Sequence, residues 1–168
     1  MLVLDTPFLR SVRVAIILGV SCAAAACNMT SETAKPALAP SSASSLVERP
    51  TTLRSETMVG KWGMASYRQE KDRNRVEAQA RDQCKLPYTI TRGPTDGVMM
   101  HVADDAKLYE LRLKGASNGK TYLGLEAPPG HPQDREIISM SNKMMVMRFS
   151  DPDADNRYGT FIYVRCVG

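Results

Sequence analysis

The chain has 168 residues, a formal charge of +4, 43% apolar residues and 24% charged residues. This composition is ordinary for a globular protein, and it excludes a collagen, a coiled coil and a multi-pass membrane protein. The length is that of one domain. Because His101 and His131 are the only histidines, a His-rich metal site and a multi-histidine catalytic centre are excluded. No basic run with interleaved aromatic residues occurs, so we expect no nucleic-acid partner.

The first segment is predicted to be an export signal. Arg10 and Arg13 precede an apolar run, residues 14–26, which is shorter than the roughly 20 residues that a membrane-spanning helix needs. A positive start, a short apolar stretch and small residues at its end are the layout of a secretory signal. The stretch Ala24-Ala25-Ala26-Cys27 resembles a lipobox, where bacterial lipoproteins are acylated on the cysteine and cut just before it.

Cysteine parity supports Cys27 as the lipidated residue. The alternative, Cys22, leaves too short an apolar core after Arg13. Cleavage before Cys27 removes Cys22 and leaves Cys84 and Cys166, an even number suited to one disulfide in an oxidising compartment. We therefore expect residues 1–26 to be a lipoprotein signal peptide and Cys27 to carry the acyl chains, palmitate among them, that bind the membrane.

A tether is predicted between the anchor and the folded domain. Residues 27–57 are rich in Ser, Thr, Ala and Pro, and such a stretch buries too little apolar surface to offset the entropy of ordering it. By resemblance to known lipoproteins, Asn28 after the cysteine implies sorting to the outer membrane. The domain, residues 58–168, is then expected to face the periplasm.

The domain is predicted to be a small antiparallel barrel of about eight strands, because short β-prone runs alternate with turn signals. The expected strands are residues 59–67, 88–91, 98–102, 108–114, 120–125, 136–140, 144–149 and 158–167. Asn118-Gly119 predicts a type I′ hairpin turn, since both residues accept positive φ angles. Ser141-Asn142-Lys143 predicts a second hairpin.

One helix is predicted after the first strand, at residues 69–84. This segment lacks Gly and Pro, and Val76, Ala80 and Cys84 fall on one helical stripe that would lie on the barrel. A disulfide between Cys84 and Cys166 would then join the helix to the last strand, and we expect it to be structural rather than redox-active because no Cys-x-x-Cys occurs. The charged face, residues 68–81, is interpreted as a solvated surface, with an interaction surface as the alternative.

A resemblance to the calycin group follows from Gly60 and Trp62, a Gly-x-Trp at the first expected strand. That group comprises lipocalins, avidins and Inh-type bacterial metalloprotease inhibitors, all closed antiparallel barrels. The resemblance implies that Arg165, on the last strand, covers Trp62 at the barrel floor, a contact worth roughly 0.5–2 kcal/mol. Gly60 would let the strand bend into the closure. The helix after the first strand departs from the lipocalin order. The whole chain also resembles small Gram-negative envelope lipoproteins.

Methionine offers a second hypothesis, a Cu(I) site. Thioethers and one imidazole suit Cu(I), and a strand period of two puts Met99 with His101 and Met145 with Met147 on common faces. The alternative is that these methionines fill an irregular core. Apart from this Cu(I) hypothesis we expect no cofactor.

Two further patterns predict no site. Residues 151–156 begin like a calcium loop, but Asn156 and Ile162 stand where Gly and Glu are required, so a solvated turn is expected. His131 lies in a loop without a nucleophile motif, and we expect no catalytic residue and no enzymatic activity.

The sequence therefore predicts an outer-membrane-anchored periplasmic lipoprotein that is a non-catalytic binding module. Recognition of a protein or small ligand would use the barrel mouth or the charged helix face. The first alternative is an Inh-type inhibitor of a secreted metalloprotease, because Ser44-Ser45-Leu46 is similar to the segment that such inhibitors insert into the protease. The second alternative is a Cu(I)-binding barrel.

Overall fold

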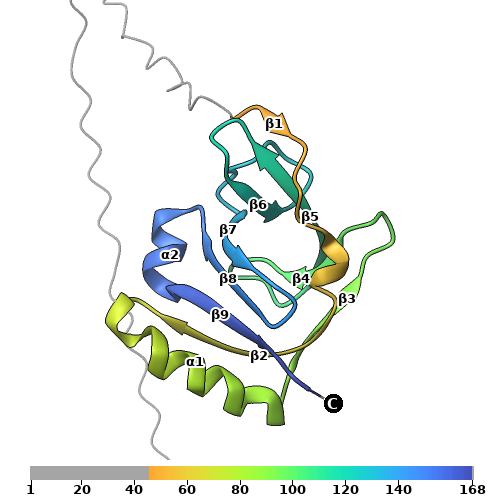
Figure 1. Ribbon diagram of the computed structural model, residues 1–168. Coiled ribbons are helices and arrows are strands. Elements are labelled where there is room, and N and C mark those ends of the chain that lie inside the picture. The colour runs from red at the N-terminus through yellow and green to blue at the C-terminus, as the bar shows by residue number, and fades with distance from the viewer. Residues whose placement is uncertain (1–45, 168) are drawn as a thin grey trace, which may run out of the picture. The chain divides into compact units, whose positions relative to one another are not determined.

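The computed structural model describes residues 46–167, so the predicted signal peptide, Cys27 and the first part of the predicted tether lie outside the described residues. Figure 1 shows how the described strands and helices are arranged. The strands are β1 (Glu48–Arg49), β2 (Gly60–Tyr67), β3 (Tyr88–Arg92), β4 (Val98–His101), β5 (Leu108–Ala116), β6 (Thr121–Gly124), β7 (Arg135–Met140), β8 (Met144–Phe149) and β9 (Thr160–Arg165). The helices are α1 (Arg73–Asp82) and α2 (Pro152–Tyr158), with short 3-10 helices η1 (Ser55–Thr57), η2 (Glu70–Asp72) and η3 (Gln83–Lys85).

Strands β2 to β9 form a closed antiparallel barrel. Their order is β5-β4-β3-β2-β9-β8-β7-β6, and the pairing of β6 with β5 closes the sheet. Strand β5 is long enough for both pairings, because residues 108–111 pair with β4 and residues 112–115 pair with β6. Strand β1 is an additional strand that pairs with the end of β5. The predicted mainly β fold, an antiparallel barrel of about eight strands, is confirmed.

The barrel interior is an apolar core that follows from the period of two along each strand. On β8, for example, Met145 and Met147 belong to the interior core, whereas Val146 between them packs on the outside. Methionine fills much of this interior, as the core interpretation of these residues predicts. The buried members of the interior core are Met58, Trp62, Ile90, Val98, Met100, Leu111, Leu123, Ile137, Met145, Met147 and Tyr163.

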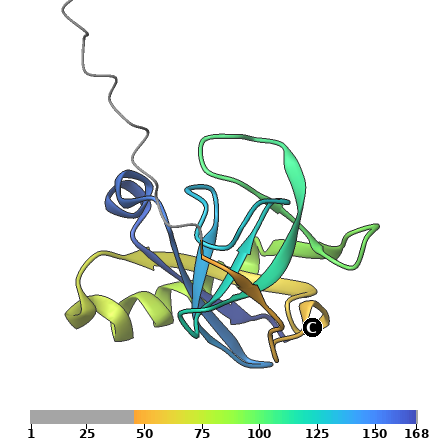
Figure 2. The same cartoon turned by 90° about the horizontal axis from the view of Figure 1, so that it is seen from above.

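A helix covers the outside of the barrel along β2 and β9, as both views show (Figures 1 and 2). The helix predicted at residues 69–84 is present as η2, α1 and η3, which together span residues 70–85. Val76 and Ala80 of α1 are buried in a second cluster. Gly63 allows this close packing, since a Cβ there would lie 1.9 Å from the carbonyl oxygen of Ala80. The outward-facing partners in the cluster are Tyr67, Val146 and Ile162.

The predicted disulfide is present and joins this helical segment to the end of the barrel. Cys84 lies in η3 and Cys166 follows β9 directly, with a Cα–Cα distance of 5.5 Å. The sequence separation is 82 residues, so the bond closes a loop that contains most of the barrel.

Four local predictions need correction. The turn expected at residues 151–156 is the start of α2, because Asp151 caps the helix by accepting from the Ala154 N–H at 2.8 Å and Pro152 occupies its first turn. The last strand therefore begins at Thr160 rather than at 158. The β5–β6 hairpin forms as predicted. Of the two turn residues Asn118 and Gly119, only Gly119 has a positive φ (79°), so the turn is not type I′.

The fourth correction concerns residues 46–57, which the composition assigned to the tether. They carry β1 and η1. The Ser117 N–H donates to the Val47 carbonyl at 2.9 Å, and this bond continues the pairing of β1 with β5. Backbone hydrogen bonds, which composition does not report, hold this segment to the barrel.

We expect the C84S/C166S variant to lose about 4–5 kcal/mol of unfolding free energy, because the bond restricts a long loop in the unfolded chain. Chemical denaturation of the variant and of the oxidised wild type measures the difference. Reduced wild type serves as the control and should match the variant. Equal midpoints for the variant and the oxidised wild type would contradict a structural role for the bond.

Candidate functional site

One end of the barrel is sealed by Trp62. Its indole N–H donates to the Met58 carbonyl at 2.8 Å, and the Arg165 guanidinium lies 4.1 Å from the ring centre. Arg165 Nη1 donates to the Val59 carbonyl at 3.0 Å. Gly60 is required beside it, since its φ is +144° and a Cβ would lie 2.4 Å from Arg165 Nη1. The structure thus brings together Gly60, Trp62 and Arg165, and it fills this end of the barrel.

The opposite end of the barrel holds a pocket of about 440 Å³. Tyr163 is a buried member of the interior core and also forms part of the lining of this pocket. The remaining lining residues come from six different strands, from the β4–β5 loop (residues 102–107) and from the end of α2. The lining residues are Met64, Tyr88, His101, Val102, Ala103, Asp104, Asp105, Ala106, Arg135, Phe149, Tyr158, Phe161 and Tyr163.

Aromatic side chains run continuously around this mouth pocket. Phe161 is central, with ring centres 5.8 Å from Phe149 and 6.2 Å from Tyr163. Tyr163 in turn lies 6.2 Å from Tyr88, whose ring centre is 5.7 Å from that of His101. Contacts at these separations stabilise aromatic pairs and offer flat apolar faces to a bound molecule.

The phenols of the pocket stay neutral. Burial raises the pKa of Tyr163 to about 12 and also raises the pKa of Tyr88. The Tyr88 hydroxyl accepts from the His101 backbone N–H at 3.1 Å and shares a hydrogen bond with Nδ1 of the same residue at 3.1 Å. These groups therefore provide polarity without negative charge.

Arg135 is the one cationic side chain of the pocket lining, and only 5% of its surface is exposed. Its Nη2 donates to the His101 carbonyl at 2.6 Å, and its Cζ lies 4.6 Å from the centre of the Phe149 ring. Nε and Nη1 are buried and have no hydrogen-bond partner. No carboxylate among residues 46–167 lies within ion-pair distance of this guanidinium.

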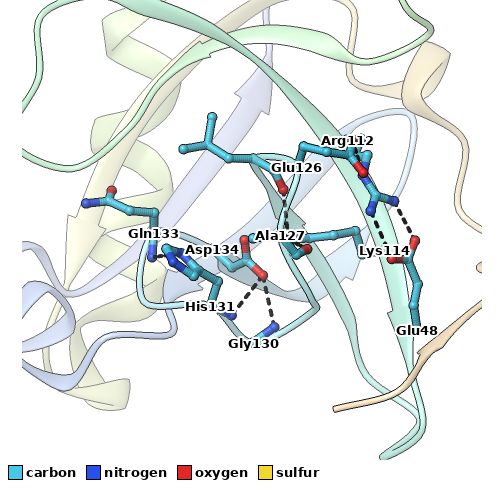
Figure 3. A network of polar contacts seen from close by, with 10 residues as sticks. Glu48, Arg112, Lys114, Glu126, Ala127, Gly130, His131, Gln133 and Asp134 are labelled. Atoms are coloured by element: carbon cyan, nitrogen blue, oxygen red, sulfur yellow. Dashed lines mark hydrogen bonds and ion pairs between the residues drawn. The ribbon is translucent and has the colours of Figure 1, made fainter. Parts of the chain in front are cut away.

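The loop before Arg135 is fixed by a fully buried ion pair (Figure 3). Lys114 Nζ donates to Asp134 Oδ1 at 2.7 Å and to the carbonyls of Leu125 and Ala127 at 3.0 and 2.9 Å. All three donors of the ammonium group are therefore used.

The carboxylate of Asp134 is equally well satisfied. Its Oδ2 accepts from the backbone N–H groups of Gly130 and His131 at 2.9 and 3.1 Å, as Figure 3 shows. Because Asp134 precedes Arg135, this network sets the point at which β7 begins and directs Arg135 into the barrel.

The rim of the pocket is held by acidic side chains of the β4–β5 loop. Asp104 pairs with Arg157 Nη2 at 2.7 Å and accepts from the Tyr158 hydroxyl, both in α2. The hydrogen bond from Tyr158 and the charge of Arg157 lower the pKa of Asp104. Asp105 accepts from the Tyr109 hydroxyl at 2.6 Å, and this bond lowers the pKa of Asp105.

The residues predicted to bind Cu(I) lie in separate surroundings. Met145 and Met147 are buried in the interior core on β8, which pairs with β7 and β9. Met99 and His101 lie on β4, which pairs with β3 and β5, and His101 lines the mouth pocket. Residues 46–167 contain no group of three or more His, Cys, Asp or Glu that could hold a metal ion.

The charged helix face is internally paired. Glu70 pairs with Arg73, Asp72 with Arg75 and Glu77 with Arg81. These pairs leave out Arg68 and Lys71, so the face keeps a net charge of +2. Ser44 and Ser45, which suggested the inhibitor alternative, lie outside the described residues.

Sequence reasoning missed most of the mouth pocket. Phe161 and Tyr163 alternate on the last strand, so a period-two count of inward positions could have found them. Arg135 could not have been found in this way, because a charged residue at the start of a strand is ordinarily solvated.

Comparison of the chain with family models, with curated proteins and with solved structures found no match in any of the three. Among the described residues, none of the helices has the length and apolar character required to cross a membrane.

We expect Lys114→Met to lower the unfolding free energy by about 3–5 kcal/mol, because it leaves the buried carboxylate of Asp134 with its two backbone N–H donors but without an opposite charge. Thermal and urea unfolding measure the loss. Arg148→Met is the matched control, since Arg148 pairs with Glu136 at the surface and should contribute less than about 1 kcal/mol. Similar losses for the two variants would show that the buried pair does not organise this loop.

Proposed function

We propose that this protein is a non-catalytic binding module that takes a small, mainly apolar ligand into the mouth of its barrel. The observation that carries the proposal is the aromatic pocket opposite the end that Trp62 seals. Its volume of about 440 Å³ suits a ligand of modest size, since small-molecule pockets measure about 300–1,000 Å³. The few polar groups among its aromatic faces would orient the ligand.

The calycin resemblance supports the same proposal. Gly60, Trp62 and Arg165 have the arrangement that the resemblance implies, at the end of the barrel where it implies it. Within that group, the lipocalins are the members with an open ligand cup, and the helix after the first strand departs from their order. The interior core reaches up to Tyr163 in this protein, so the ligand would occupy the mouth rather than the depth of the barrel.

We propose binding without turnover, and the residues that line the pocket support this. The lining holds no Ser, Thr, Cys or Lys, and its two carboxylates are engaged, Asp104 by Arg157 and Asp105 by Tyr109. The Nδ1 atom of His101 is engaged by the Tyr88 hydroxyl. The described contacts add nothing that favours the inhibitor or the Cu(I) alternative.

We propose in addition that the protein is anchored at the outer membrane. A lipid on Cys27 would hold the domain at the outer membrane, facing the periplasm, where the pocket would meet ligands of the cell envelope. The disulfide between Cys84 and Cys166 supports export, because such bonds persist in oxidising compartments.

We expect the full chain, expressed in a Gram-negative host, to be recovered in the outer-membrane fraction with its mature N-terminus at an acylated Cys27. Two or more acyl chains give a stable anchor, at about 0.8 kcal/mol per buried CH₂. Mass spectrometry and membrane fractionation measure this. C27S should be released or remain unprocessed, whereas C22S should behave like the wild type. A soluble, unacylated wild type would refute the anchor.

We expect the neutral fluorophore N-phenyl-1-naphthylamine to bind the mature protein at one site, with emission that rises because the pocket excludes water. Phe149→Ala and Phe161→Ala should each weaken binding about tenfold or more, since burying such a ring against the ligand contributes about 1.5–3 kcal/mol. Ile138→Ala is the control, because Ile138 is exposed on β7 and does not line the pocket. Absence of binding to a folded wild type would refute the proposed pocket function.

A further inference from the structure

We propose that the ligand is an organic monoanion, a carboxylate on an aliphatic or aromatic body, and that its charged group is recognised by Arg135. The apolar body would lie against the aromatic rings of Phe149, Phe161 and Tyr163. This inference rests on the proposed function, because it assigns a ligand class to the same mouth pocket.

The buried charge of Arg135 is not compensated by a described acidic side chain. Burial of a cation costs several kcal/mol unless an opposite charge and hydrogen bonds accompany it. The other fully buried cation in residues 46–167, Lys114, has Asp134 and two carbonyls as partners. Arg135 is 5% exposed and has one carbonyl, that of His101. The fold thus retains a positive charge that no described acidic group balances.

Arg135 also has hydrogen-bond donors that remain without an acceptor. Nη2 is used by His101, whereas the N–H groups of Nε and Nη1 are buried and have no acceptor. Buried donors are nearly always paired in folded proteins, and an unpaired one indicates a missing partner. Protein atoms cover Nε and Nη1 in the structure, so the guanidinium would shift toward an anionic group entering from the pocket, which would then supply both the acceptors and the negative charge.

The apolar lining and the acidic rim of the pocket indicate which class of anion would bind. Apart from Arg135 and the rim, the lining is aromatic and aliphatic, so it favours a ligand with an apolar body. Asp104 and Asp105 stand at the rim and carry negative charge of their own. They disfavour a multiply charged anion such as inorganic phosphate, whereas a single carboxylate on an apolar body avoids most of this repulsion.

A purely structural role for Arg135 makes a different prediction. If the contact with Phe149 and the hydrogen bond to His101 were its purpose, Arg135→Gln would lower the melting temperature. If Arg135 is kept for an anion, removal of a buried unpaired charge should leave the melting temperature unchanged or raise it, as happens at binding residues that reduce stability.

The test compares three matched eight-carbon competitors, octanoate, 1-octanol and octylamine, which displace N-phenyl-1-naphthylamine from the mature protein. We expect octanoate to displace the probe from the wild type at a concentration at least tenfold below those of the other two. Arg135→Gln should remove this advantage while 1-octanol is unaffected, and Arg135→Lys should keep part of it. Arg148→Gln, a surface arginine on β8, is the control and should leave all three competitors unchanged.

The outcomes separate this inference from the proposed function. Equal displacement by octanoate and 1-octanol, or an Arg135→Gln variant that still prefers octanoate, overturns the anion assignment and leaves an apolar pocket. Inorganic phosphate that competes as well as octanoate overturns the choice of an apolar monoanion. Failure of the probe to bind the wild type overturns both proposals. The wild-type comparison requires no variant, so an unfolded Arg135→Gln protein would not spoil the test.

Discussion

The pairing of β5 with both β4 and β6 is the constraint on which the structure depends. It closes the sheet, so inward-facing side chains from every strand share one interior that has two ends and no lateral edge. One end is filled by Trp62, over which Arg165 lies while it donates to backbone carbonyls. At the other end the interior core stops at Tyr163, and the space above it becomes the mouth pocket.

The two arginines of the barrel ends are in contrasting situations. Arg165 donates through Nε, Nη1 and Nη2 to the carbonyls of Asn142, Val59 and Thr57. Arg135 also lies against an aromatic ring, but its Nε and Nη1 have no acceptor. The same residue type thus completes the structure at one end and leaves it electrostatically incomplete at the other. This difference is why we place ligand recognition at the mouth.

Local patterns predicted much of the fold for physical reasons that operate over a few residues. Alternation located most strands, and the stripe of Val76, Ala80 and Cys84 located the helix that packs on the barrel. Composition gave wrong predictions at two segments, α2 and β1, whose structure is set by hydrogen bonds. The Asp-Pro start of α2 resembled a turn, and β1 was hidden in a Ser- and Pro-rich stretch because its pairing partner, β5, lies far along the chain.

The sequence by itself determined the class of fold, the disulfide and the group of side chains that seals one end, because each depends on a short-range period, on cysteine parity or on a motif that resembles a known barrel. Only the tertiary structure decided the mouth pocket. Its lining comes from six strands, a loop and a helix, and barrel closure brings them together. Whether Arg135 is solvated or buried depends on that closure and on the loop held by Lys114 and Asp134. No local pattern around residue 135 carries this information.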